Sequence, residues 1–208
     1  MRNRTRKVHV NAPMIAAVAT AVFRGGPVEG EAVASRHPSG RGTLLRVHLT
    51  KVPKGEHGFH IHRAGDLRGE GCKGACDHFH VGRPCRHGAA PTSHTRKARH
   101  SHSQRHSQRH SGVHSARQSA SQSWRSSSLE LDRHSGDLGN IPSASPTHPF
   151  CRSYHLAEFP PHILWGRSLI VHADKDDLGK GSHEDSGTTG HSGTRIGCAI
   201  FGRASGCV

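Results

Sequence analysis

The sequence predicts an all-β sandwich or barrel. Short segments rich in apolar and β-branched residues recur along the chain between turn signals, and no segment has the period of an amphipathic helix. Glycine (25 residues) and proline (11 residues) are frequent, as expected for many short strands joined by turns. The 208 residues are enough for one domain with a hydrophobic core.

The segment from Met14 to Phe23 has two interpretations. Val18, Thr20 and Val22 alternate with small residues before a glycine turn, which is the pattern of a first β-strand. The same segment is an apolar run preceded by basic residues, as in a signal peptide, and it is too short to span a bilayer. We expect the strand and a cytoplasmic protein. Secretion is the alternative, if residues 1–21 act as a signal peptide.

Turn signals divide the first third of the chain into further β-prone pieces. They lie at Gly25-Gly26-Pro27, Pro38-Ser39-Gly40 and Pro53-Lys54-Gly55. Between the last two, apolar and polar residues alternate over 45–49, which predicts a strand with one buried face.

Loops and strands alternate through the rest of the chain. Residues 63–90 are rich in glycine, cysteine and histidine without periodicity, and residues 173–194 are polar, so both are expected to be loops. Prolines between 142 and 149 argue against a central strand there, because proline removes a ladder donor. Later strands are expected at 150–156, 166–172 and 195–201.

The net charge of +14 is concentrated in two segments. Four Lys or Arg residues lie in 1–9, and residues 91–133 hold eight against two acidic residues, so ten of the fourteen charges lie there. We interpret 1–13 as a basic tail, and 91–133 as a disordered insertion rich in His, Ser and Arg within a domain spanning 14–208, because such sequence supports no core. We expect no specific nucleic-acid partner; salt-dependent, non-specific binding through these segments is the alternative.

Histidine placement carries the chemistry. In the run His57 to His62, a strand would put His60 and His62 on one face and Phe59 and Ile61 on the other. Two imidazoles on one face of a rigid strand can chelate a metal, and neutral imidazole suits both copper and zinc. Further candidate ligands lie on loops or at a strand end: His78, His87, His134, Asp137 and His172. Three histidines with one aspartate complete a tetrahedral zinc site.

Several ordered blocks match one family: Gly58 to His62, Gly71-Cys72 with His78-Phe79, Gly136 to Asn140, Gly166 to His172, Asp176 to Gly181, and Thr189 to Cys198. Through them the chain resembles the copper–zinc superoxide dismutases over about residues 15–90 and 134–203. The resemblance implies an eight-stranded Greek-key β-barrel, an immunoglobulin-like sandwich architecture with long loops. It also implies an enzyme that converts superoxide to dioxygen and hydrogen peroxide with copper and zinc as cofactors.

The resemblance assigns roles to individual residues. The implied copper ligands are His60, His62, His78 and His172, and the implied zinc ligands are His78, His87, His134 and Asp137. His78 would bridge the two metals. Asp176 would link a copper ligand to a zinc ligand, Arg195 would guide and hold superoxide, and Cys72 would form a disulfide with Cys198. The resemblance leaves open a homodimer and a copper chaperone. We expect no membrane partner, because the longest apolar run is too short to span a bilayer.

The chain departs from the family in two places. The insertion at 91–133 separates His87 from His134, which is tolerable because loop-closure entropy grows slowly with length. The proline-rich stretch 142–149 stands where the family has a strand. The alternative to an enzyme is a non-catalytic copper-binding or copper-carrier relative. We expect the enzyme, because every implied metal position and Arg195 are present.

Overall fold

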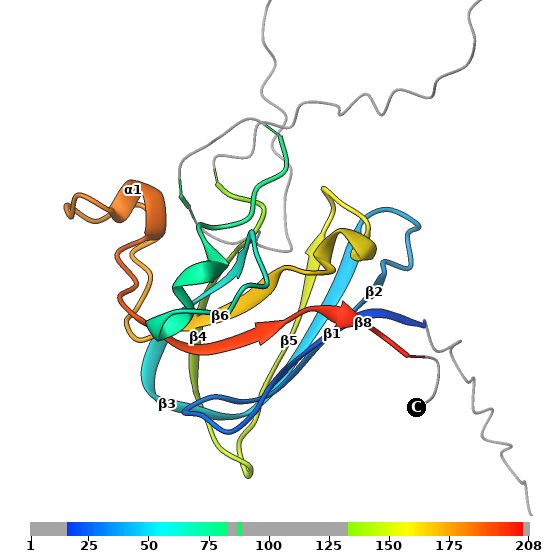
Figure 1. The fold of residues 1–208 in the computed structure, drawn as a ribbon, viewed down its shortest axis with the longest axis horizontal. Helices are drawn as coiled ribbons and strands as arrows, with labels where there is room; N and C mark the ends of the chain where they lie inside the picture. Colours follow the sequence, from blue (N-terminus) through cyan, green and yellow to red (C-terminus); the bar gives the residue numbers. More distant parts are fainter. Residues whose placement is uncertain (1–15, 83–86, 89–132, 206–208) are drawn as a thin grey trace, which may run out of the picture. The chain divides into compact units, whose positions relative to one another are not determined.

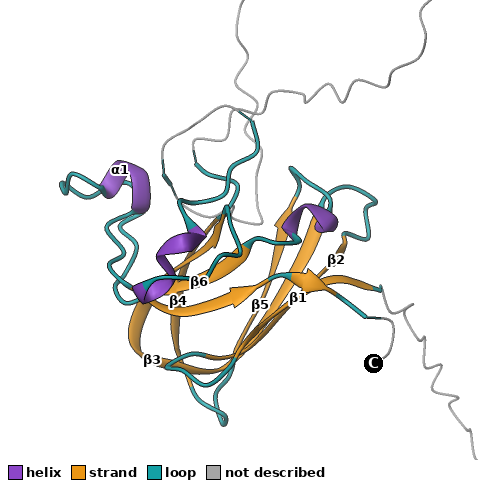
Figure 2. Ribbon diagram, viewed as in Figure 1, coloured by secondary structure: helices purple, strands orange, loops and turns teal. Residues whose placement is uncertain are grey.

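Eight strands form a nearly closed antiparallel barrel in the part of the chain that the structure, a computed structural model, describes: residues 16–82, 87–88 and 133–205 (Figure 1). The strands there are β1 (Ala17–Phe23), β2 (Glu29–Arg36), β3 (Thr43–His62), β4 (Asp137–Ala144), β5 (Phe150–Leu156), β6 (Ser168–His172), β7 (Arg195–Ile200) and β8 (Gly202–Arg203). Three short helices, η1 (Glu70–Ala75), η2 (Pro161–Leu164) and α1 (Ser186–Thr189), lie in the connections (Figure 2). The predicted all-β class is confirmed.

The long strand β3 organises the barrel. Its first half pairs with β2 and β5, and its second half pairs with β4 and β6. The turn signal at Pro53-Lys54-Gly55 predicts a break, yet the strand continues through it. Gly55 has φ 128°, so this segment bends the strand from one half of the barrel into the other.

The strand order is that of a Greek key. Hydrogen-bonded neighbours follow the order β7-β6-β3-β2-β1-β8, which places the last strands of the chain beside a strand from its first third. The expected strand over 14–23 is observed as β1, which pairs with β2 on one side and with β8 on the other. The late strands expected at 150–156, 166–172 and 195–201 are β5, β6 and β7.

The core lies inside the barrel and follows the period-two pattern of the strands. In β3 the apolar residues Leu45 and Leu49 are buried, whereas Arg46 and His48 between them are exposed. Phe59 and Ile61 continue the buried row, each with 0% exposure. Full burial of one such side chain stabilises the fold by about 1.5–3 kcal/mol, so the strand is fixed in register where it carries the histidines.

The proline-rich stretch is an edge strand followed by a turn. β4 contains Pro142 and, among the described strands, pairs only with β3. A proline is tolerated at such an edge because the ladder requires no N–H on the free side. Beyond Ala144 the chain turns, with a bridge between Ser145 and His148. No central strand forms here, as expected, but the strand that the resemblance implies is present.

The connections differ in part from the expectation of plain loops. The 63–90 segment includes η1, and the 173–194 segment includes α1. The basic tail at 1–13 and residues 91–132 of the expected insertion lie outside the described residues. Arg133, expected to end the insertion, is described and buried, so the ordered domain resumes there. No helix among the described residues is both long and apolar enough to cross a membrane.

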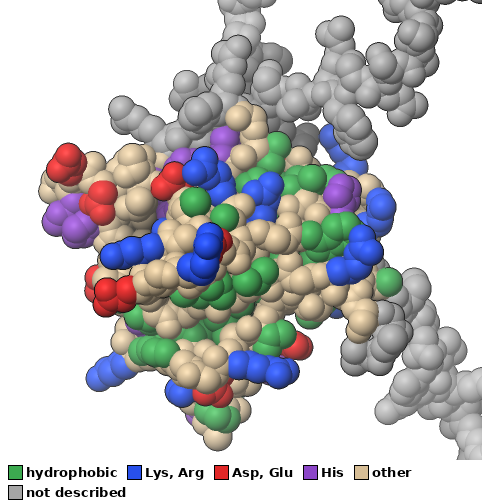
Figure 3. Space-filling model, in the orientation of Figure 1, with side chains coloured by type: hydrophobic (Ala, Val, Ile, Leu, Met, Phe, Trp, Pro, Cys, Tyr) green, Lys and Arg blue, Asp and Glu red, His purple; other side chains and the backbone are tan. Residues whose placement is uncertain are grey.

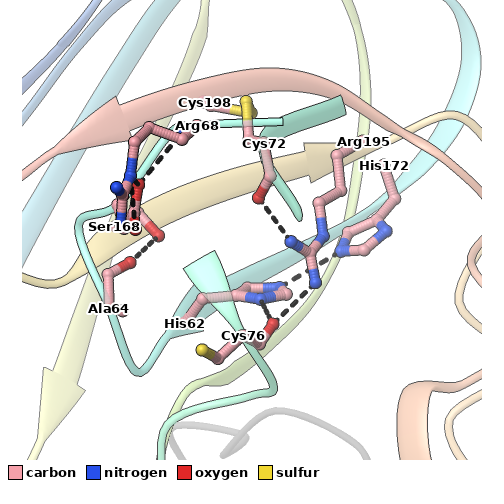
Figure 4. Close-up of a disulfide and its surroundings, with 10 residues drawn as sticks. His62, Ala64, Arg68, Cys72, Cys76, Ser168, His172, Arg195 and Cys198 are labelled. Atoms are coloured by element: carbon pink, nitrogen blue, oxygen red, sulfur yellow. Dashed lines mark hydrogen bonds and ion pairs between the residues drawn. A yellow bond between two sulfur atoms is a disulfide. The ribbon is translucent and has the colours of Figure 1, made fainter. Parts of the chain in front are cut away.

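A disulfide between Cys72 and Cys198 ties η1 to β7, as the resemblance implied (Figure 4). The two cysteines are 126 positions apart in the sequence. A crosslink that closes so long a loop restricts the unfolded chain strongly. It also fixes the segment that follows η1, whose carbonyl groups contact the site described below.

Replacing Cys198 with serine should therefore lower the free energy of unfolding of the metal-free protein by roughly 2–5 kcal/mol. Urea denaturation of the oxidised protein measures this. Cys151→Ser is the matched control, because Cys151 is an exposed free cysteine on β5, and its effect should stay within about 0.5 kcal/mol. Equal stability of the two variants would contradict a stabilising crosslink.

Candidate metal centre

The end of β3 presents two imidazoles on one side of the strand. His60 and His62 are 0% and 1% exposed, with ring centroids 6.4 Å apart. Phe59 and Ile61 lie on the opposite face in the core, as the alternation predicts. Because the core holds the strand, the two imidazoles have fixed positions.

Two more histidines join this pair. His172 ends β6, which pairs with β3, and the ring of His57 bonds to the His172 carbonyl at 2.9 Å. His78 forms an isolated bridge with His62, and its ring centroid lies 4.1 Å from that of His60. The resulting group of four, which could hold a metal ion, is His60, His62, His78 and His172. These are the residues predicted for copper.

A second group adjoins the first around Asp137, at the start of β4. The Asp137 carboxylate lies 2.8 Å from His78 Nδ1 and 3.1 Å from His87 Nδ1. The tight group that could hold an ion here is His60, His78, His87 and Asp137. His134, predicted as a zinc ligand, stands just outside it, with Nδ1 3.4 Å from Asp137 Oδ2 and its side chain 16% exposed. The three histidines predicted for zinc therefore meet at the carboxylate of the fourth predicted ligand, Asp137.

The outer ring nitrogens are held in place. The Asp176 carboxylate accepts hydrogen bonds from His60 Nε2 at 2.8 Å and from His87 Nε2 at 2.7 Å. It thus links one member of the first group to one of the second, as the resemblance implied. His62 Nδ1 and His172 Nδ1 bond to the carbonyl groups of Cys76 and Gly193. Such bonds fix the tautomer and orientation of a metal-ligating histidine.

Several inward-facing ring nitrogens make no hydrogen bond. Among the described residues, His60 Nδ1 and His78 Nε2 are buried without one, while His87 Nδ1 and His134 Nδ1 face the Asp137 carboxylate at 3.1 Å and 3.4 Å without hydrogen-bond geometry. A buried polar atom left without a partner costs about 1–3 kcal/mol. His62 Nε2 and His172 Nε2 also face each other at 3.4 Å. Imidazole nitrogens aimed into a buried space fit a copper ion and a zinc ion that share His78.

Burial and neighbouring charges set the protonation of these rings. Burial, together with the nearby His78, lowers the pKa of His60 and His62 well below the ordinary value. Burial also lowers the pKa of His172 to about 4. Burial opposes the charged form of His87 too, yet the carboxylates of Asp137 and Asp176, one beside each ring nitrogen, prevail and raise its pKa to about 9. The first group is therefore neutral, as metal ligands must be.

Arg195 lies at the edge of the first group (Figure 4). It begins β7 and is paired in register with His172. Its Nη1 donates to the Cys72 carbonyl and its Nη2 to the Cys76 carbonyl, each at 2.6 Å. The Cys76 carbonyl also accepts from His62 Nδ1. Arg195 is thus a fixed positive charge beside the candidate copper ligands.

Comparison with known proteins identifies the family. Residues 28–201 match the family described as copper/zinc superoxide dismutase. The chain belongs to the copper/zinc superoxide dismutase family.

Individual relatives agree with this assignment. The chain is 36% identical over 160 residues to a provisionally named Cu-Zn superoxide dismutase of Orgyia pseudotsugata multicapsid polyhedrosis virus, covering 74% of this chain and 78% of the relative. It is 33% identical to the provisionally named counterpart of Autographa californica nuclear polyhedrosis virus, covering 85% and 92%. It is 32% identical to the extracellular Cu-Zn superoxide dismutase of Haemonchus contortus, covering 77% and 68%.

Among solved structures, the crystal structure of the clock protein EA4 shares the fold. The TM-score is 0.62 at 24% sequence identity, covering 93% of this chain and 99% of the other.

The sequence reasoning missed three residues that position the centre of this superoxide dismutase family member. Asn140 Nδ2 donates to the Asp176 carbonyl, and Asn140 Oδ1 accepts from the Asp176 N–H. Arg133 Nη1 donates to the carbonyl groups of His134 and Asp137. Gly190, at φ 68°, packs so closely that a Cβ there would collide with the Asp176 carboxylate. Asn140 and Gly190 each lie in a block that resembles the family, and that was their signal in the sequence; Arg133 had none.

Asn140→Ala should weaken metal binding although Asn140 contacts neither predicted ligand group directly. Losing the two bonds to the Asp176 backbone loosens the carboxylate that orients His60 and His87, and such outer partners are typically worth about 10–100-fold in metal affinity. Competition with a zinc chelator measures the change. Thr147→Ala, in the exposed turn after β4, is the control and should bind zinc as the unaltered protein does. Unchanged zinc affinity in Asn140→Ala would show that Asp176 needs no such clamp.

Proposed function

We propose that the protein is a superoxide dismutase, which converts two superoxide anions and two protons into one dioxygen and one hydrogen peroxide. The observation that carries the proposal is the pair of adjoining buried ligand groups, which have His60 and His78 in common and in which His60 Nδ1 and His78 Nε2 make no hydrogen bond. The family assignment supports the same conclusion. Membership of the family would also be compatible with a copper carrier, so an experiment must distinguish the enzyme from the carrier.

The residues present would hold both metals. Copper would be held by His60 Nδ1, His62 Nε2, His78 Nε2 and His172 Nε2. Zinc would be held by Asp137 and by the Nδ1 atoms of His78, His87 and His134. When bound, copper would supply one-electron redox chemistry toward superoxide, and zinc would supply charge and structure.

The protein's own groups prepare this chemistry. Asp176 holds the rings of His60 and His87 through their outer nitrogens, so the ligand nitrogens stay aimed inward. His78 belongs to both ligand groups: its Nδ1 lies against the Asp137 carboxylate, and its Nε2 is buried without a hydrogen bond. His78 Nε2 is accordingly the atom that would hold a proton during turnover.

Arg195 is the group that would bind the anionic substrate. Its guanidinium has five N–H donors, and the two bonds to the Cys72 and Cys76 carbonyls orient it without neutralising its charge. A fixed positive charge at the entrance of a buried site raises the encounter rate with an anion. The same two bonds also give Arg195 a structural role, which the sequence alone did not indicate.

Metal content and superoxide decay test the proposal together. The reconstituted protein should contain one copper and one zinc per chain and accelerate superoxide decay. Removal of copper should abolish that acceleration while the barrel stays folded. Metal analysis, circular dichroism and direct observation of superoxide absorbance are the measurements. Stable copper binding without accelerated decay would refute the enzyme and favour the carrier.

Arg195→Ile should slow superoxide decay at least about tenfold, equivalent to roughly 1.4 kcal/mol of lost stabilisation. Arg195→Lys should retain more activity because the charge remains, although the two-pronged geometry is lost. The rate of the unaltered protein should also fall more steeply with ionic strength than that of Arg195→Ile.

Arg46→Ile is the matched control for charge, because Arg46 is exposed in the first half of β3. The stability of each variant is measured alongside, since Arg195 also holds the segment around η1. A folded, metal-loaded Arg195→Ile protein with full activity and unchanged salt dependence would rule out Arg195 as the guiding residue.

A further inference from the structure

A second histidine cluster lies on the surface, in the loop that carries α1. The rings of His183 and His191 are stacked, with centroids 3.6 Å apart and planes at 8°. His191 Nδ1 lies 2.7 Å from Asp185 Oδ1. Figure 3 shows histidine and acidic side chains gathered on the side of the molecule where α1 lies in Figure 1. None of these three side chains takes part in the copper and zinc groups.

The conformation of the backbone places these three side chains next to one another. The single turn of α1 starts after Asp185, whose carbonyl accepts the N–H groups of Thr188 and Thr189. The chain then reverses through Gly190 at φ 68° and His191 at φ 48°. A left-handed conformation costs free energy for a residue other than glycine, and it persists only where the surroundings enforce it. Here it returns position 191 to the side of position 183.

The loop is anchored to the barrel, although the cluster itself is exposed. The Asp177 N–H donates to the Gly190 carbonyl at 2.9 Å, and the Ser186 hydroxyl donates to the Asp177 carboxylate. His87, on another segment, donates its N–H to the Gly187 carbonyl. Hydrogen bonds at both ends of α1 therefore fix the backbone that carries the cluster.

The donor set suits a divalent transition-metal ion. Two imidazoles and a carboxylate are the ligands that zinc takes, and the three side chains share one open patch of surface with Glu184 and Thr188. Two ligands of a tetrahedral zinc ion with bonds near 2.0–2.1 Å lie about 3.3 Å apart. Asp185 and His191 are already close to that separation. Exposed side chains change rotamer within nanoseconds, so His183 can turn from the stack to the same ion.

We propose that His183, Asp185 and His191 form a surface site for a divalent transition-metal ion such as Zn²⁺, separate from the copper and zinc centre. It goes beyond the dismutase function and does not depend on it. The chain offers a natural comparison in His37 and His155, which are also stacked with centroids 3.6 Å apart. Their ring nitrogens bond to the Ser39 hydroxyl and to the Arg41 carbonyl instead of to a carboxylate.

The test uses the full chain with copper and zinc already loaded. Zn²⁺ is added up to about 1 mM and its binding is followed by calorimetry. Histidine modification by diethylpyrocarbonate, read peptide by peptide in a mass spectrometer, locates the ion. We expect added Zn²⁺ to protect His183 and His191 but not His37 and His155.

The variants separate this site from other histidines that take up zinc. His191→Ala and Asp185→Asn should each raise the zinc concentration needed for half-maximal protection of His183 at least about tenfold. His155→Ala should leave it unchanged, and all three variants should keep their loaded copper and zinc. The proposal is overturned if Zn²⁺ does not protect His183 and His191, or if His191→Ala and Asp185→Asn leave the protection of His183 as it was.

Discussion

The alternation of side chains along the second half of β3 places Phe59 and Ile61 in the core and His60 and His62 on the opposite face. The geometry of the metal centre depends on this one constraint. A shift of one residue in register would exchange the two faces, burying imidazoles in the core and leaving the apolar side chains at the ligand site. Pairing with β4 on one side and β6 on the other prevents the shift, and β6 delivers His172 by the same pairing.

Around that strand, buried polar side chains hold one another in place through hydrogen bonds. Asp176 satisfies the outer nitrogens of His60 and His87, and Asn140 satisfies the backbone of Asp176. His60 Nδ1 and His78 Nε2, in contrast, are buried without a hydrogen bond, and a metal ion would satisfy them. The unsatisfied nitrogens therefore lower the free energy of unfolding of the metal-free protein, and metal binding raises it again. Metal affinity and folding are coupled in this way. The disulfide at Cys72 and the bonds from Arg195 hold the segment around η1 against the same centre.

Much of the fold and the ligand set could be predicted from the sequence, because both follow short-range rules. Period-two alternation marked the strands, and the His60–His62 spacing marked one face of a strand. The continuity of β3 through Pro53 to Gly55 could not be predicted. Proline and glycine occur both where a chain reverses direction and where a strand bends into a second sheet, so the residues alone do not distinguish the two cases. The role of Asn140 depends on a contact between positions 36 apart in the sequence, which no local pattern encodes. The position of β4 at an edge, where Pro142 disrupts no strand pairing, likewise depends on the topology of the sheet and could not be predicted from local sequence.

The proposed metal centre depends on His78 being shared between two metal ions. Anomalous diffraction from crystals of the loaded protein, collected at the copper and zinc absorption edges, would locate both ions. We expect copper bonded to Nε2 of His78 and zinc bonded to Nδ1 of the same ring, beside Asp137. A His78 ring bonded to one metal alone, or either ion held elsewhere on the chain, would contradict it.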